Sequence, residues 1–462
     1  MPEAARPLAI LIAVRLPEVD ATASDASLDE LTRLVTTLGY EVSERLVQAR
    51  ENLAPAAVLG EGKLKELAKL TGGSGRTQPT IPGQRKTKLD QDDSEDEDER
   101  DFPARDADEP EDAAHEHQIA LVAVDHDISP SQLRNLERAT GVPVLDRTGI
   151  IIEIFHRHAR SREARLQVEI ARLAYESPRL RESPKSKEKQ QGRGAGEAAL
   201  ELDRRKIRDR IAELRRELAA VVRDQDVRRK HRKSARRVAL VGYTNAGKSS
   251  LMRALTGSEV YVEDKLFATL DTTVRALTPE AKPRILVSDT VGFIKQLPHD
   301  LVASFKSTLD EALEASLLLH VVDASDPGFR SQLDVTRDVL REIGAEQVPN
   351  RLVMNKVDRL SPEALAELES ELPEAWFISA RQPEHVKTVR ARIIDFFESR
   401  YAEAELSVPY SEQRLVSEMH EQGRVVSERY EDDGVKVRFR SDPEVLDAFR
   451  ARLLRSAADA LS

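Results

Sequence analysis

A lysine followed by a serine, at the end of a glycine-rich turn, is the part of this sequence best suited to chemistry. Gly242, Gly247, Lys248 and Ser249 fit the spacing G-x-x-x-x-G-K-[ST], which cradles nucleotide phosphates. Glycines let the backbone approach phosphate oxygens, the lysine ammonium reaches the outer phosphates, and the serine hydroxyl binds Mg²⁺. The alternative, a glycine-rich turn that only joins core elements, is disfavoured by the flanking residues.

The elements that must position this turn are a strand before it and a helix after it. Residues 238–241 are apolar and predict a buried strand, and a helix is predicted from Lys248 to a stop at Gly257. The amino terminus of such a helix directs free N–H groups and a partial positive charge toward an anion. Strand, turn and helix together predict a nucleotide site.

A second apolar strand, residues 284–289, ends in groups that complete a phosphate site. Asp289 is placed to hold Mg²⁺ through water, and the backbone N–H of Gly292 is placed to meet a γ-phosphate. Residues 266–273 (LFATLDTT) precede this strand and predict a mobile loop that supplies a threonine to the metal. The candidates are Thr269, which we prefer, and Thr272 and Thr273.

Two further apolar strands end in residues suited to a guanine base. Residues 351–358 (RLVMNKVD) end in Asn355, Lys356 and Asp358. A carboxylate only accepts hydrogen bonds, so Asp358 suits a base edge with a ring N–H beside an amine, which is guanine rather than adenine. Residues 377–380 (FISA) follow, and the Ala380 N–H lies where it can meet the guanine oxygen. Each short match is weak alone, but their order predicts a GTP-binding domain.

The residue types around the phosphate site also bear on hydrolysis. Position 293 is Phe, which cannot orient water as the glutamine often found there does, so we expect slow intrinsic turnover that a partner completes. Asn245 resembles the asparagine of GTPases that recruit K⁺. The alternative is that it is a turn-forming residue.

The predicted site comprises three overlapping sets. The GTP-binding set is Gly242, Tyr243, Thr244, Asn245, Ala246, Gly247, Lys248, Ser249, Ser250, Asp289, Thr290, Val291, Gly292, Asn355, Lys356, Asp358, Ser379, Ala380 and Arg381. The catalytic set is Lys248, Asn245, Thr269 and Gly292, and the Mg²⁺ ligands are Ser249, Thr269 and Asp289. The expected cofactors are therefore GTP or GDP, Mg²⁺ and, through Asn245, K⁺.

Length and composition limit the class of protein. A chain of 462 residues is long enough for two to four domains, and the absence of cysteine excludes disulfides and thiolate metal sites. The longest apolar run, residues 8–14, is too short to cross a membrane and reads as a first strand. We expect a cytoplasmic protein without a membrane anchor, acting as a monomer.

Charge is strongly segregated along the chain. Residues 90–112 carry 14 acidic residues against two arginines, whereas residues 157–237 carry 26 Lys and Arg against 13 Asp and Glu. The acidic segment lies in a stretch, 73–118, with hardly any large apolar residue, which predicts disorder. A less favoured reading is that this stretch mimics nucleic acid and covers the basic segment. The basic segment itself favours a polyanionic partner over a merely solvated helical face.

Hydrophobic periodicity predicts a multidomain α/β protein around the P-loop GTPase domain. Strands at 7–16, 40–48, 119–124, 142–145 and 149–155 alternate with helices at 27–38 and 129–139, and residues 58–70 predict a strand end, a glycine-containing turn and a short helix. Two helices with apolar seams, at 164–175 and 200–221, predict an antiparallel pair. Its flexible loop carries the predicted RNA-binding residues Lys185, Lys187, Lys189 and Arg193. The predicted domains are an amino-terminal α/β domain (1–158, with the acidic disordered insert 73–118), a basic helical hairpin (159–234), a GTP-binding domain (235–400) and a small α+β carboxy-terminal domain (401–462).

Several segments resemble the HflX family of GTPases, over nearly everything outside the acidic insert. They are VLDRTGIIIEIF (144–155), LQVEIARL (166–173), LELDRRKI (200–207), GYTNAGKSSL (242–251), LFATLDTT (266–273) and DTVGFIKQLPHDLVASFKSTL (289–309). The resemblance implies binding to the large ribosomal subunit and its RNA, and separation of stalled ribosomes into subunits in the GTP state. The chain departs from the family at Ala195, where proline is usual, and at Ser250, where threonine is common.

Other functions remain as alternatives. One is an RNA- or ribosome-binding protein that uses GTP mainly as a structural ligand. Another is a nucleotide-dependent RNA remodelling factor, such as an ATP-driven helicase, which is disfavoured by the single phosphate-binding motif and by the guanine-type NKVD at 355–358. A membrane-anchored signalling GTPase is disfavoured by the lack of a lipidation cysteine.

Overall fold

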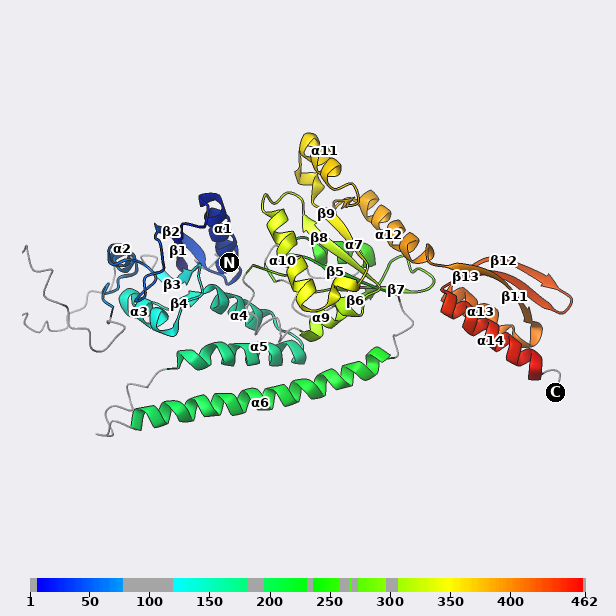
Figure 1. The fold of residues 1–462 in the computed structure, drawn as a ribbon, viewed down its shortest axis with the longest axis horizontal. Helices are drawn as coiled ribbons and strands as arrows, with labels where there is room; N and C mark the ends of the chain where they lie inside the picture. The colour runs from blue at the N-terminus through cyan, green and yellow to red at the C-terminus, as the bar shows by residue number, and fades with distance from the viewer. Residues whose placement is uncertain are drawn as a thin grey trace, which may run out of the picture. The chain divides into compact units, whose positions relative to one another are not determined.

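The computed structural model describes residues 6–77, 119–180, 195–230, 236–257, 266–267, 273–295 and 306–459. The chain divides into two compact units, Met1–Ile154 and Phe155–Ser462 (Figure 1). The division into four domains is finer than these two units and stays a prediction. Among the described residues, no helix is both long and apolar enough to cross a membrane.

The first unit is built on a four-stranded parallel sheet in the order β2-β1-β3-β4. Its strands are β1 (Leu8–Arg15), β2 (Glu41–Ala49), β3 (Ile119–Val124) and β4 (Val144–Asp146). Its helices are α1 (Ala21–Thr37), α2 (Glu61–Thr71), α3 (Pro130–Thr140) and the start of α4 (Arg147–His158). Strands and helices alternate along most of this unit, as predicted. Nearly all of β1 is buried, as expected for a strand in the middle of a parallel sheet.

Several boundaries in this unit differ from the predictions. The first helix begins at Ala21 and not at residue 27, because the side chain of Asp20 accepts from Ala21 N and caps it. Residues 73–77, predicted as the start of the disordered insert, lie against α3, where Gly75 N donates to Ala139 O at 2.9 Å. Residues 78–118 lie outside the described residues.

The predicted strand at residues 149–155 is wrong, because this segment is part of α4. Its continuous run of isoleucines has high strand propensity, and periodicity cannot separate a fully buried strand from a fully buried helix. The carboxylate of Asp146, at the end of β4, accepts a hydrogen bond from Gly149 N at 2.8 Å and so supports a helix start. The apolar residues on the helix are almost entirely buried, which outweighs the propensity of single residues.

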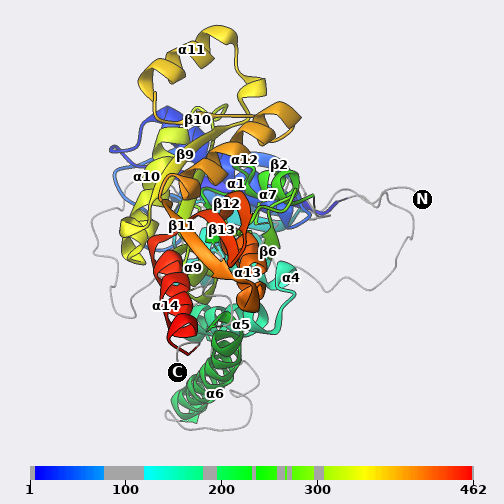
Figure 2. The same ribbon diagram turned by 90° about the vertical axis from the view of Figure 1, so that its right-hand side faces the viewer.

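The second unit includes an antiparallel helix pair, α5 (Arg162–Glu176) and α6 (Ala195–Lys230), as predicted. The two helices lie along each other in Figure 1, and α6 is seen nearly end-on in Figure 2. Between them lies a short 3₁₀ turn at Ser177–Arg179. Leu166 and Ile170 of α5 pack on Leu214 of α6, so the predicted apolar seams do meet. α6 has 36 residues and α5 has 15, so a large part of α6 extends past α5.

A six-stranded sheet follows in the order β10-β9-β8-β5-β7-β6, parallel except for the edge strand β6. The strands are β5 (Arg236–Val241), β6 (Thr273–Ala276), β7 (Ile285–Asp289), β8 (Leu317–Asp323), β9 (Asn350–Asn355) and β10 (Trp376–Phe377). The helices are α7 (Lys248–Thr256), α9 (Lys306–Leu313), α10 (Phe329–Glu342), α11 (Pro362–Glu371) and α12 (Pro383–Glu398). Separate apolar clusters on the two faces bury the strands, with α7 and α12 on one side and α9 and α10 on the other (Figure 1).

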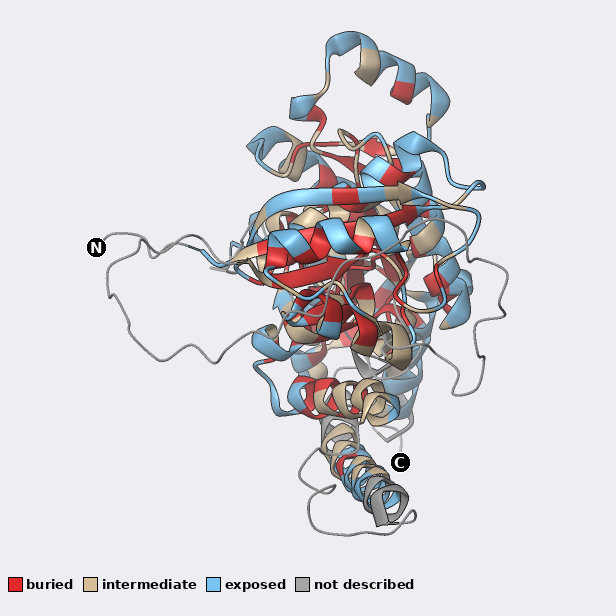
Figure 3. Ribbon diagram, turned by 90° about the vertical axis from the view of Figure 1, so that its left-hand side faces the viewer, coloured by how far each residue is buried: buried red, intermediate tan, exposed pale blue. Residues whose placement is uncertain are grey.

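The last part is an antiparallel sheet in the order β11-β13-β12, with two helices packed on one face. Its elements are β11 (Ala402–Pro409), α13 (Arg414–Gln422), β12 (Arg424–Glu431), β13 (Gly434–Ser441) and α14 (Pro443–Asp459). β12 and β13 form an antiparallel hairpin. Figure 3 shows the buried residues concentrated in strands and on the inner faces of helices, as layered packing requires.

Candidate nucleotide-binding site

A cavity of about 890 Å³ lies where the carboxyl ends of β5, β7 and β9 meet the starts of α7 and α12. Most of the predicted GTP-binding residues line it, namely Thr244, Asn245, Gly247, Lys248, Ser249, Ser250, Thr290, Gly292, Asn355, Lys356, Asp358, Ser379, Ala380 and Arg381. The remaining predicted residues, Gly242, Tyr243, Ala246, Asp289 and Val291, do not line the cavity. The fold therefore brings four separated motifs to one cavity, at the sheet edge where α/β proteins bind ligands.

The glycines of the phosphate loop are required by close contacts with neighbouring strands. Gly242 has φ +146°, and a Cβ atom there would lie 2.1 Å from Val321 O of β8. Gly247 has φ +96°, and a Cβ atom there would lie 2.2 Å from Asn355 Nδ2 of β9. Both positions combine a left-handed backbone with a lack of space, so any side chain would distort the loop.

Lys248 lies under this loop, with 6% of its surface exposed. Its Nζ donates to Gly242 O at 3.0 Å and to Tyr243 O at 2.8 Å. Burial lowers the pKa of Lys248 to about 8, and the opposite charge of Asp289 limits the fall. A desolvated ammonium at the amino terminus of α7 is suited to a phosphate anion, which would favour its charged form.

Ser249 and Asp289 form the pair best suited to a metal. Ser249 Oγ donates to Asp289 Oδ2 at 2.6 Å, and the carboxylate is fully buried. No group of three or more His, Cys, Asp or Glu side chains that could hold a metal occurs in the described parts of the chain. One carboxylate and one hydroxyl fit Mg²⁺, which usually takes few protein ligands and completes its shell with phosphate and water. The preferred third ligand, Thr269, and its alternative Thr272 lie outside the described residues, and Thr273 begins β6.

The segment after Asp289 is attached to the phosphate loop by its backbone. Phe293 N donates to Gly242 O at 3.1 Å, and Thr244 N donates to Phe293 O at 2.8 Å. The Phe293 ring is 2% exposed and packs in the core between β5 and α9, so it is not available to a water in the cavity. The Thr290 hydroxyl donates to Leu240 O at 2.8 Å, which indicates a structural use of that side chain.

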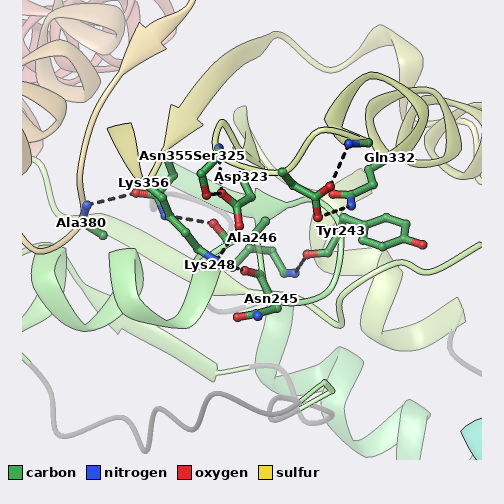
Figure 4. A network of polar contacts seen from close by, with 12 residues as sticks. Tyr243, Asn245, Ala246, Lys248, Asp323, Ser325, Gln332, Asn355, Lys356 and Ala380 are labelled. Carbon is green, nitrogen blue, oxygen red and sulfur yellow. Dashed lines mark hydrogen bonds and ion pairs between the residues drawn. The ribbon is translucent and has the colours of Figure 1, made fainter. Parts of the chain in front are cut away.

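The guanine-type motif is held against the phosphate loop by two side chains (Figure 4). Asn355 Nδ2 donates to Ala246 O at 2.9 Å, and its Oδ1 accepts from Ala380 N at 3.0 Å. Lys356 Nζ donates to Asn245 O at 2.7 Å. Asn355 is 2% exposed and its bond to Ala246 O is buried, so this contact specifies the geometry strongly.

Two residues that support this geometry were not predicted. Asp323, at the end of β8, pairs with Lys356 Nζ at 2.7 Å, and both side chains are largely buried (Figure 4). The apolar run before Asp323 resembles the runs before the other motifs, so a strand-end search could have found it. His385 of α12 accepts a hydrogen bond from Ser379 N at 2.9 Å, and no local motif signals this contact.

These features define a P-loop GTPase: a phosphate loop, a serine–aspartate pair for a divalent cation and a guanine-type Asn-Lys-x-Asp, all on one α/β sheet. Comparison with protein families agrees. Residues 237–356 match the family described as "50S ribosome-binding GTPase". Residues 158–232 match "GTP-binding GTPase Middle Region", and residues 25–77 and 104–156 match "GTP-binding GTPase N-terminal".

Full-length relatives narrow this class. The chain is 58% identical over 455 residues to GTPase HflX of Gluconacetobacter diazotrophicus, with 98% of each chain covered. It is 35% identical over 416 residues to GTPase HflX of Escherichia coli (strain K12), covering 88% of this chain and 87% of that one. The chain therefore belongs to the HflX family of GTPases, and it is an enzyme that binds and hydrolyses GTP.

A solved structure, "crystal structure of SsGBP and GDP complex", is more distant. It covers 84% of this chain and 98% of its own, at 22% identity and a TM-score of 0.44. This likeness is too remote to support statements about the site.

Proposed function

We propose that this GTPase binds the large ribosomal subunit and, with GTP bound, dissociates stalled ribosomes into subunits in the cytoplasm. The main support for this proposal is the similarity along the whole chain to GTPase HflX proteins. In addition, the GTP-binding domain matches the family described as "50S ribosome-binding GTPase". Hydrolysis to GDP, stimulated by the ribosome, would then reset the protein.

The helix pair supports a polyanionic partner such as ribosomal RNA. α6 spans about 54 Å at about 1.5 Å per residue, and only part of that length is paired with α5. Its arginines include Arg208 and Arg210, which are exposed and pair with Glu201 and Glu213 of the same helix, within a segment of strong positive charge. Such a helix is long enough to carry its loop away from the GTP-binding domain and into a crevice of a large partner. The predicted RNA contacts Lys185, Lys187, Lys189 and Arg193 lie outside the described residues and stay a prediction.

The geometry of the cavity supports slow hydrolysis by the free protein. We assign Lys248 to the outer phosphates, Ser249 and Asp289 to Mg²⁺, and the Gly292 N–H to the γ-phosphate. When bound, Mg²⁺ would neutralise charge that develops on the phosphate oxygens. Phe293 stands at the position of the missing glutamine and is committed to the core, so it cannot orient a water in the cavity. The ribosome is the proposed source of the group that orients water.

The test is GTP turnover with and without purified large subunits, in potassium buffer, with Lys248→Ala as the blank. We expect a rise of about a hundredfold, which is about 2.7 kcal/mol of activation barrier. Sedimentation of stalled ribosomes should also show subunits with GTP and the protein present, and intact ribosomes with GDP. An unchanged turnover would instead favour the alternative function, an RNA-binding protein with GTP as a structural ligand.

We also propose that K⁺ assists hydrolysis through Asn245. This residue lines the cavity and has φ 59°, a left-handed conformation that asparagine tolerates. The same conformation fits the alternative role of a turn-forming residue. Turnover should be faster in K⁺ than in Na⁺, and the difference should disappear in Asn245→Ala; equal rates in the two salts would leave only the turn-forming role.

A further inference from the structure

The loop that carries the guanine-facing backbone is supported from behind by a histidine. After β10 the chain passes through Ser379 and Ala380 along the wall of the cavity. Ser379 is 1% exposed, and its backbone N–H donates to His385 Nδ1 at 2.9 Å. A buried N–H without an acceptor is costly, so this bond matters for the loop conformation.

The position of His385 follows from how α12 begins. Gln382 is the N-cap but makes no side-chain capping bond, and Pro383 is the first helical residue. The third helical residue can direct its side chain back toward the chain before the helix, as glutamate does in a capping box. His385 occupies this third position and reaches Ser379, six residues earlier.

The bonds around Ser379 hold the peptide groups on both sides of it. Ser379 O accepts from Gln382 N at 3.0 Å, while Ser379 N is held by His385. Because a peptide group is planar, the direction of Ser379 O also sets the direction of the Ala380 N–H. That N–H points to Asn355 Oδ1 at 3.0 Å, at the cavity wall. The bond from Gln382 N thus orients the peptide group that contains the Ala380 N–H, and His385 holds the peptide group before it.

We propose that His385 is a positioning residue for guanine recognition: it holds the loop of Ser379 and Ala380, so that the Ala380 N–H, which donates to Asn355 Oδ1, is placed to meet the 6-oxygen of a bound base. The inference rests on the role assigned to Ala380 and does not depend on ribosome binding. Accepting from Ser379 requires an unprotonated Nδ1, so the ring carries its proton on Nε2. The imidazole also borders a hollow of about 350 Å³ beside Thr388 and Arg392. It is therefore not tightly enclosed, and replacing it should disturb few packing contacts.

The test compares two nucleotides in the full-length protein. GDP has the 6-oxygen and the ring N–H next to it, whereas 2-aminopurine riboside diphosphate lacks both but keeps the 2-amino group and the phosphates. We expect His385→Ala to raise the Kd for GDP about tenfold, the effect of about 1.4 kcal/mol, by loss of one acceptor for a buried donor. The Kd for the 2-aminopurine nucleotide should change less than about twofold.

Two further variants distinguish positioning from general support of the fold. His385→Asn keeps an oxygen acceptor near the place of Nδ1 and should restore GDP affinity. Thr388→Ala, one turn along α12, removes a hydroxyl that bonds only within the helix to Glu384 O, and should leave both affinities unchanged. Equal weakening of both nucleotides by His385→Ala, or failure of His385→Asn to restore GDP binding, would overturn the proposal. A wild-type protein that binds both nucleotides equally would reject the assigned role of Ala380 itself.

Discussion

The buried ammonium of Lys248 predicts that nucleotide affinity depends on pH. Burial lowers its pKa to about 8, against an ordinary value of 10.5. The phosphates of a bound nucleotide would favour the charged form, so the complex binds more protons than the free protein above pH 8. Affinity must then fall as the pH rises through this range, because binding has to recover the proton.

The size of the effect follows from the populations of the free protein. With a free pKa of about 8, the neutral fraction of Lys248 rises from about one quarter at about pH 7.5 to about three quarters at about pH 8.5. If the ammonium stays charged in the complex, the Kd for GDP increases about threefold over that interval. The free energy of unfolding depends on pH in the opposite direction. The lowered pKa of Lys248 reduces the stability of the nucleotide-free protein below pH 8, and this loss of stability disappears as the pH rises from about 8 toward 10.5.

The assay is titration of a fluorescent GDP analogue over this pH range with wild-type protein and Lys248→Arg. Arginine stays charged throughout, so the ratio of the two Kd values cancels ionisation of the nucleotide and of other protein groups. We expect the Kd of the wild-type protein, divided by the Kd of Lys248→Arg, to rise with pH. Parallel pH curves for the two proteins would refute the reasoning, since Lys248 would then not change its protonation on binding.

Three substitutions test the packing around the site and beyond it. Gly247→Ala places a Cβ 2.2 Å from Asn355 Nδ2 and should weaken GDP binding at least about tenfold. The control Gly344→Ala is also at positive φ, but a Cβ there would have no atom within 4 Å, so it should cost about 1 kcal/mol of unfolding free energy and leave GDP binding intact. Calorimetric titration with GDP compares the two variants. Leu214→Ala removes the most buried side chain of the apolar cluster between α5 and α6 and should loosen the two helices, seen as faster amide exchange there with unchanged GDP affinity. Gly423→Ala would place a Cβ 2.4 Å from an aromatic ring of β13 and should cost about 1–3 kcal/mol of unfolding free energy, measured by denaturant titration; an unchanged midpoint would show that the ring moves freely.

The phosphate loop was predictable because its chemistry is local. Gly242, Gly247, Lys248 and Ser249 act within one turn, so their spacing alone specifies a backbone that surrounds a phosphate. The guanine-type motif was predictable for a similar reason, since parallel strands end at the same sheet edge. By contrast, residues 149–155 were mistaken for a strand, because a short apolar run satisfies a buried strand and a buried helix equally well.

By itself, then, the sequence determined the class of ligand and predicted most of the residues that line the cavity, through short-range spacing and side-chain chemistry. Only the tertiary structure decided which residues hold that site in place. Asp323 reaches Lys356 because β8 lies beside β9. His385 reaches Ser379 because α12 begins at Pro383, which makes His385 the third residue of the helix and turns its side chain back toward the loop. Such contacts depend on strand order, helix direction and burial, and these follow from the packing of the whole sheet rather than from any local pattern.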